Sequence, residues 1–123
     1  MFDQGDILDG LNEQQRRAAT HEAGPLLVLA GAGTGKTRTL VARAAWLRDT
    51  QGMRANRILL LTFTRRAAGD MLARAASGAS GASSAGGSSG RICGGTFHAT
   101  AHKIIRQHAE SFSLPPQFTI LDQ

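Results

Sequence analysis

A short glycine-rich segment between two apolar patterns constrains the fold of this chain more than any other feature. Glycines stand at positions 31, 33 and 35, and Lys36 and Thr37 follow them. Residues 26–30 read LLVLA, a short apolar run after Gly-Pro that is typical of a strand buried on both faces of a parallel sheet. Residues 40–47 carry apolar side chains at helical spacing. The segment therefore predicts a strand, a tight loop and a helix, in that order, within an α/β fold.

The loop has the residue types that bind the phosphates of a nucleotide. Glycines let several backbone N–H groups turn toward one phosphate, and the following helix directs its positive end to the same point. The Lys36 ammonium can reach the β- and γ-phosphates, and the Thr37 hydroxyl can bind Mg²⁺. We expect a nucleoside triphosphate, ATP foremost, to bind with Mg²⁺ at Ala30, Gly31, Ala32, Gly33, Thr34, Gly35, Lys36 and Thr37.

One position departs from the usual pattern of such loops. The strict pattern begins with Gly, whereas this chain has Ala30 there. The competing interpretation is a glycine-rich turn between a strand and a helix in which Lys36 and Thr37 are incidental. The correct order of strand, loop, Gly-Lys-Thr and helix favours the phosphate loop.

Strand and helix patterns alternate along the rest of the chain. Four apolar runs predict strands, at residues 26–30, 57–63, 91–95 and 118–121. Helices are expected to open at Asn12, which is a good N-cap, directly after the loop, after Phe63 and near Phe97. The last helix has one face formed by Ala101, Ile104, Ile105 and His108. The alternation predicts right-handed crossovers and a parallel sheet flanked by helices.

Two segments are expected to lie outside this core. Residues 1–10 are interpreted as a flexible N-terminal tail, and residues 11–123 as the N-terminal portion of one α/β domain. Residues 77–90 contain only Gly, Ala and Ser and can bury almost no apolar surface, so a flexible loop is expected there. Because the sequence stops just after an apolar run with no closing helix, the fold is expected to be incomplete.

Charge and cysteine content restrict the partners and the compartment. The chain carries 14 Lys and Arg against 9 Asp and Glu, a formal charge of +5, which favours polyanionic partners, although a merely basic surface is the alternative. Its single cysteine, Cys93, allows no internal disulfide and is interpreted as a buried strand residue. No secretory signal and no apolar run of about 20 residues is present, so a cytoplasmic location without a membrane is expected.

Two further segments carry candidate binding residues. Gln15 offers an amide that can donate to and accept from the adenine edge, although a surface glutamine is more often simply solvated. Phe63 ends the second predicted strand, where open α/β sheets bind ligands, and Thr64, Arg65 and Arg66 follow it. An aromatic ring beside hydroxyls and arginines suits a stacked base with its phosphates. The alternative places Phe63 in the core and the arginines in solvent.

A third segment stands at the end of the next predicted strand. Thr96, Phe97 and His98 enter a helix there, and the hydroxyl, the imidazole and the exposed amides could hold a phosphate backbone. The alternative is a helix cap with a buried Phe97.

Together and in this order, the segments resemble the first half of domain 1A of the UvrD/Rep/PcrA-type DNA helicases of superfamily 1A. The matching sequences are LNEQQRRAA (the Q motif), LLVLAGAGTGKTRTLVARAAWL (motif I), LLLTFTRRAAGDM (motif Ia) and GTFHATAHKIIR. The resemblance covers residues 11–76 and 91–123. The family commonly has Asn-Lys at the positions of Arg65 and Arg66, and Glu at the position of Asp70.

The resemblance implies a RecA-like P-loop NTPase fold and an ATP-dependent 3′-to-5′ DNA helicase that acts in repair or replication. It implies that Gln15 recognises adenine, that Arg38 lies near the nucleotide, and that Lys36 and Thr37 serve catalysis. The DNA-binding residues would be Phe63, Thr64, Arg65, Arg66, Thr96, Phe97 and His98. The implied partners are single-stranded DNA at a duplex junction and the remaining helicase domains.

The chain lacks one feature that hydrolysis requires. No apolar strand ending in Asp-Glu follows the loop, so no residue pair holds Mg²⁺ and activates water. We therefore expect the isolated 123 residues to bind ATP weakly and to hydrolyse it negligibly. Three functions other than an ATP-dependent DNA helicase are possible for a chain with these motifs. They are a stand-alone, non-catalytic module for ATP or single-stranded DNA, a RecB-like helicase–nuclease fragment, and a small-molecule kinase. Phe63 and residues 95–98 argue against the kinase.

Overall fold

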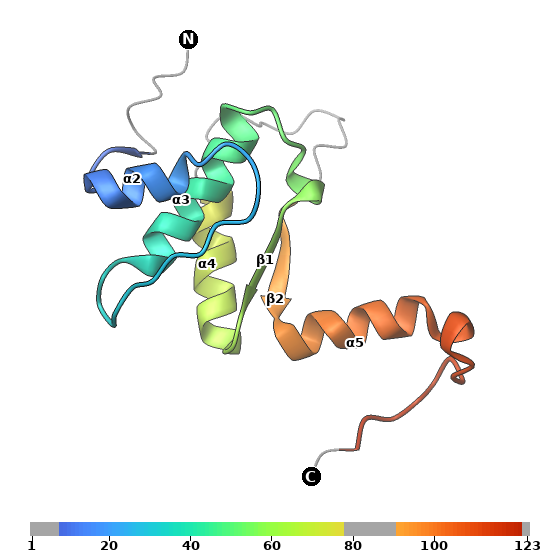
Figure 1. Ribbon diagram of the computed structural model, residues 1–123. Coiled ribbons are helices and arrows are strands. Elements are labelled where there is room, and N and C mark those ends of the chain that lie inside the picture. The colour runs from blue at the N-terminus through green and yellow to red at the C-terminus, as the bar shows by residue number, and fades with distance from the viewer. Residues whose placement is uncertain (1–7, 78–90, 122–123) are drawn as a thin grey trace.

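The computed structural model describes residues 8–77 and 91–121 (Figure 1). Within them the chain forms a mixed α/β structure around two parallel strands. The elements are α2 (Glu13–Ala19), α3 (Lys36–Asp49), the 3₁₀ turn η1 (Ala55–Arg57), β1 (Leu59–Thr62), α4 (Arg65–Ser77), β2 (Cys93–Thr96), α5 (Phe97–Gln107) and the 3₁₀ turn η2 (Ala109–Phe112). The predicted flexible loop falls almost wholly in residues 78–90, outside the described residues.

β1 and β2 confirm two of the predicted strands and their parallel arrangement. Their register pairs Leu59 with Cys93 at one end and Thr62 with Thr96 at the other. Both strands are shorter than the apolar runs that predicted them. Because the pair is parallel, the two carboxyl ends lie at the same edge of the sheet, and α4 and α5 both start from that edge (Figure 1).

Polar side chains fix where the helices begin. At α2, the Asn12 side chain accepts a hydrogen bond from the Gln15 N–H at 2.8 Å, and the Gln15 side chain accepts one from the Asn12 N–H at 2.9 Å. This capping box confirms the predicted N-cap. Thr64 and Thr96 play the same part for α4 and α5, since their hydroxyls accept from the N–H groups of Ala67 and Ala99, each at 3.2 Å.

The core lies on one side of the strand pair. α4 packs against both strands and α3 packs against α4, and their contact buries Ala44, Ile58, Leu60, Met71 and Ala75. Met71 is 2% exposed and is the largest fully buried side chain. A second cluster, of Leu11, Ala19 and Ala42 with Leu8, joins α2 to α3.

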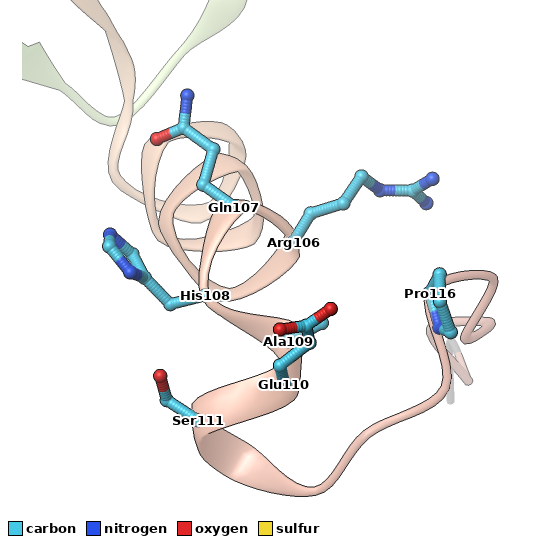
Figure 2. A pocket seen from close by; sticks show the side chains of 7 residues that line it. All are labelled: Arg106, Gln107, His108, Ala109, Glu110, Ser111 and Pro116. Atoms are coloured by element: carbon cyan, nitrogen blue, oxygen red, sulfur yellow. The ribbon is translucent and has the colours of Figure 1, made fainter.

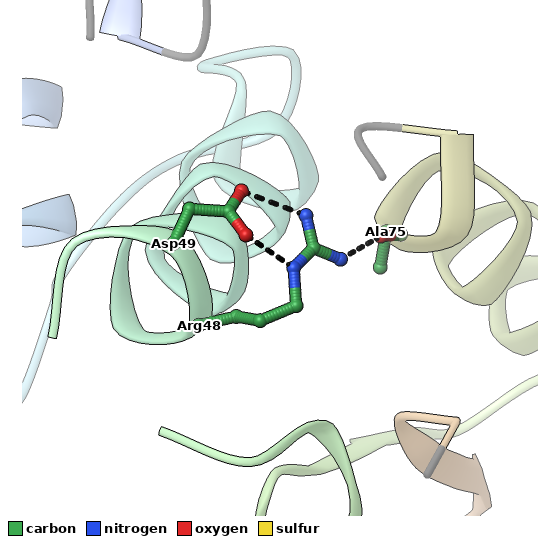
Figure 3. A network of polar contacts seen from close by, with 3 residues as sticks. All are labelled: Arg48, Asp49 and Ala75. Atoms are coloured by element: carbon green, nitrogen blue, oxygen red, sulfur yellow. Dashed lines mark hydrogen bonds and ion pairs between the residues drawn. The ribbon is translucent and has the colours of Figure 1, made fainter. Parts of the chain in front are cut away.

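Two arginines of α3 bind the carboxyl-terminal ends of its neighbours. Figure 3 shows the Arg48 guanidinium between Asp49, whose oxygens lie 2.6 and 2.8 Å away, and the Ala75 carbonyl near the end of α4, at 3.0 Å. The hydrogen bond to Asp49 raises the pKa of Arg48. Arg43 donates to the carbonyls of Ala18, Ala19 and His21, at the end of α2. Such contacts satisfy carbonyl groups that a helix end leaves without partners.

Two of the predicted strands are absent from the described residues. Residues 26–30 are irregular, with Leu27 81% and Leu29 88% exposed, and residues 118–121 are also irregular, with Leu121 90% exposed. A strand requires a neighbour whose backbone groups pair with its own. β1 and β2 pair with each other in the part of the chain described, and no described strand lies beside either segment. The strand predictions for 26–30 and 118–121 were therefore wrong for this structure.

Burial on both faces of the sheet was also a wrong prediction. Successive side chains of a strand point to opposite faces, and α4 covers only the face on which Leu60 lies. On the other face Leu59 is 51% exposed and Cys93 is exposed, contrary to the buried position predicted for this cysteine.

The remaining helix, α5, extends away from the strand pair (Figure 1). None of its residues is buried, and Ile104 on its predicted apolar face is 48% exposed. Among the described residues, no helix combines the length and the apolar character needed to cross a membrane.

The cap at α4 leads to a stability prediction. Replacing Thr64 by alanine removes the acceptor for the Ala67 N–H and should lower the free energy of unfolding by about 1 kcal/mol, the usual cost of losing such a cap. Thr64→Ser keeps the hydroxyl and should retain most of the free energy of unfolding that Thr64→Ala loses. Urea unfolding followed by far-UV circular dichroism measures both variants, and equal stability of all three proteins would contradict the capping role.

Candidate nucleotide and nucleic-acid sites

The glycine-rich loop leads directly into α3. Gly33 and Gly35 have φ values of 72° and 80°, in the left-handed region that other residues adopt only at a cost. Gly35 is the N-cap of α3, and Lys36 and Thr37 form the first turn of this helix. All residues of the loop are exposed apart from the partly buried Gly35. The predicted phosphate-binding residues are therefore accessible at the positive end of a helix of 14 residues.

Two hydrogen bonds close the loop on itself. The Lys36 ammonium donates to the Ala30 carbonyl at 3.3 Å, and the Thr34 hydroxyl donates to the Gly31 carbonyl at 2.7 Å. Because Ala30 is the first residue of the loop and Lys36 the first residue of α3, the first bond extends the lysine side chain across the loop. A flexible lysine in that position can exchange a neutral carbonyl for phosphate oxygens, with which it forms stronger, charge-assisted bonds.

The structure brings Gln15 to this loop. Its Nε2 donates to the Thr34 carbonyl at 2.9 Å, across a sequence separation of 19 residues. Arg38, predicted to lie near the nucleotide, is exposed in the first turn of α3, and its guanidinium donates to the Asp9 carbonyl at 3.3 Å. The sequence predicts either a contact with adenine or a solvated side chain for Gln15, and its contact with the loop backbone was not predicted. The three-residue spacing of Asn12 and Gln15 was the signal that could have indicated this contact. In a capping box this spacing turns the glutamine amide back toward the start of its helix.

A second group of predicted residues meets at the carboxyl edge of the strands. Phe63 follows β1 and Phe97 follows β2, and their ring centroids lie 5.2 Å apart with planes inclined by 38°. Phe63 is 85% exposed and Phe97 is 46% exposed, so neither ring is a core residue. We call these two side chains the aromatic pair. Both residues are candidates from the sequence alone, whereas the contact between their rings is seen only in the structure.

The polar residues predicted to bind DNA surround the aromatic pair in sequence. Thr64, Arg65, Arg66 and His98 are exposed, whereas Thr96 is 9% exposed and caps α5. The edge of the sheet therefore presents an aromatic surface with cationic and hydroxyl groups beside it.

A third aromatic contact lies farther along α5. Phe118 packs edge-on against His102, with ring centroids 5.5 Å apart, and the Arg106 guanidinium lies 5.4 Å from the Phe118 ring centre. Arg106 Nη2 lies 3.3 Å from His102 Nε2. The apolar run around Phe118 predicts a strand, so the sequence holds no signal for this contact.

One hollow of about 370 Å³ lies at the turn between α5 and η2. Figure 2 shows that its side chains spread around the turn and do not converge on one point. None of them belongs to the predicted nucleotide or DNA residues. The lining residues are Arg106, Gln107, His108, Ala109, Glu110, Ser111 and Pro116.

Comparison with known proteins agrees with the resemblance of the motifs. The chain is 42% identical over 116 residues to DNA helicase II of Escherichia coli, and the match covers 94% of this chain but 15% of that protein. It is 41% identical over 125 residues to DNA helicase II of Haemophilus influenzae, covering 99% of this chain and 16% of that protein. ATP-dependent DNA helicase UvrD1 of Mycobacterium tuberculosis is 41% identical over 118 residues, 94% of this chain and 14% of that protein.

The chain thus spans about 15% of the length of the relatives that it matches. The sequence model of one family, the UvrD/REP helicase N-terminal domain, matches residues 11–123. This match includes the glycine-rich loop, Gln15 and both members of the aromatic pair. The chain belongs to the UvrD/REP helicase N-terminal domain family.

Proposed function

We propose that this chain is the N-terminal, ATP-binding part of a RecA-like motor in an ATP-dependent DNA helicase. The observation that carries the proposal is the loop, in which left-handed glycines lead into α3 directly before Lys36 and Thr37. A triphosphate fits this arrangement because the loop offers backbone N–H groups, a helix N-terminus and a mobile ammonium. The names of the relatives, DNA helicase II and ATP-dependent DNA helicase UvrD1, support the same assignment.

In this proposal the residues near the loop divide the binding of the nucleotide among them. The backbone N–H groups of residues 31–35 bind phosphate oxygens, and Lys36 exchanges its bond with the Ala30 carbonyl for the β- and γ-phosphates. The Thr37 hydroxyl is exposed in the first turn of α3, where it can bind Mg²⁺ beside the phosphates. Gln15 is proposed to recognise the adenine base, and Arg38 is proposed to lie near the nucleotide.

The aromatic pair is proposed to bind single-stranded DNA. A base has two π-faces, and a ring that is 85% exposed, as in Phe63, can stack on one of them. Arg65 and Arg66 follow Phe63 closely in sequence and can neutralise the phosphates on either side of a stacked base. The His98 ring, next to Phe97 in sequence, can form a hydrogen bond with these phosphates. Thr96 contributes indirectly, since it fixes the start of α5 and with it the position of Phe97.

Hydrolysis and unwinding are proposed for the whole protein. The sequence of this chain offers no Asp-Glu pair to activate water, so turnover requires residues from elsewhere in the helicase. Closure of two RecA-like domains on ATP would then move the strand in the 3′-to-5′ direction, in repair or replication in the cytoplasm.

A turnover assay on the full-length protein tests the proposal. We expect ATP hydrolysis that rises when oligo-dT is added, together with ATP-dependent displacement of a strand from a duplex with a 3′ single-stranded tail. Binding of both ligands without turnover would favour a non-catalytic module. An absence of binding to Mg·ATP would overturn the proposal.

A further inference from the structure

We propose that Gln15 is a positioning residue for the phosphate loop, in addition to any contact with adenine. Its side-chain amide fixes the direction of the peptide group between Thr34 and Gly35. The inference rests on the proposed function in one respect, namely that the loop binds a triphosphate.

The capping box determines which end of the Gln15 amide faces the loop. Oε1 accepts from the Asn12 N–H at 2.9 Å, so this end of the amide is held at the start of α2. Nε2 is left to face the loop, where it donates to the Thr34 carbonyl at 2.9 Å. The Gln15 N–H in turn donates to the Asn12 side chain, and this second hydrogen bond stabilises the same turn. A local helix cap therefore orients a contact with a distant segment.

Holding the Thr34 carbonyl also orients the next N–H group. No cis peptide bond occurs among the described residues, and in a trans peptide the C=O and N–H bonds point in opposite directions. Because the Thr34 carbonyl points to Gln15, the Gly35 N–H must point away from α2. Gly35 is the N-cap of α3, so this N–H belongs to the amides at the positive end of the helix that can bind a phosphate.

The absence of a side chain at Gly35 fits the same contact. A Cβ atom built on Gly35 would lie 2.7 Å from Gln15 Nε2, closer than the two atoms can pack. The φ of 80° also disfavours any other residue. Glycine is thus needed at this position both for the turn and for the approach of the glutamine amide.

Binding of a ligand without a base separates positioning from adenine recognition. We would titrate the full-length protein with magnesium tripolyphosphate and with Mg·ATP by calorimetry, using the variants Gln15→Glu and Gln15→Met. The glutamate keeps the acceptor for the Asn12 N–H but loses the donor to Thr34, and the methionine is uncharged and of similar length. Gln14→Met is the matched control, because Gln14 is an exposed residue of the same helix.

The expected result is a loss of affinity for tripolyphosphate by about 3- to 10-fold in both Gln15 variants, the effect of one hydrogen bond, with no change in Gln14→Met. The affinity for ATP should fall by at least the same factor. Weaker ATP binding with unchanged tripolyphosphate binding would overturn the inference, because Gln15 would then act only on the base. A loss confined to Gln15→Glu would also overturn it, as charge repulsion would explain it. If the unmodified protein binds neither ligand, the proposed function itself fails.

Discussion

Replacing Lys36 by alanine is expected to reduce the DNA-stimulated ATP turnover of the full-length protein by about 10²–10³-fold. This is the usual effect of removing one preorganised hydrogen-bond donor that stabilises the charge developing in a transition state. The ammonium is the only cationic group among residues 30–37, and its bond to the Ala30 carbonyl already places it across the loop. Phosphate release measured at saturating oligo-dT checks this expectation.

The chain offers a matched control for this substitution. Lys103 is its only other lysine and is exposed on α5. Lys103→Ala removes the same charge from the same chain and should leave phosphate release at saturating oligo-dT unchanged. Activity of Lys36→Ala within a few-fold of the unmodified protein would show that the loop does not serve the triphosphate in catalysis.

The second large effect is expected at the aromatic pair. Replacing Phe63 by alanine should weaken binding to labelled oligo-dT by about 1–3 kcal/mol, or about 5- to 150-fold, because a stacked base loses its partner. Fluorescence anisotropy of the full-length protein measures the affinity. Phe63→Trp keeps an aromatic face and should bind nearly as well as the unmodified protein.

Salt dependence distinguishes stacking from a general loss of DNA binding. Phe63 carries no charge, so the slope of log affinity against log salt should stay the same in Phe63→Ala, whereas Arg65→Ala should lower this slope by about 1. Phe112→Ala is the control, since this phenylalanine is 58% exposed in η2 and forms no part of the aromatic pair. Unchanged affinity of Phe63→Ala would refute stacking at this ring.

Local signals in the sequence predicted local structure. The side chains of Asn12, Thr64 and Thr96 hydrogen-bond within one helical turn, so the starts of the helices could be read from residue types and spacing. The turn that leads into α3 was predictable for the same reason, because Gly33 and Gly35 supply positive φ angles that do not depend on distant residues.

Features that depend on distant residues were not predictable from the sequence. Whether residues 26–30 form a strand depends on a neighbour for pairing, and whether Cys93 is buried depends on which face of the strands a helix covers. The contact between Phe63 and Phe97 follows from the register of β1 and β2, which places Thr62 opposite Thr96. Residue composition specifies neither the register nor the covered face.

The hydrogen bond between Arg48 and the Ala75 carbonyl joins the end of α3 to α4. α3 has 14 residues and a length of about 21 Å, and it begins at the glycine-rich loop and ends where Arg48 binds α4. α4 in turn begins two residues after Phe63. The Arg48 hydrogen bond and the buried contacts around Met71 therefore connect the helix that begins at the glycine-rich loop with the helix that follows Phe63.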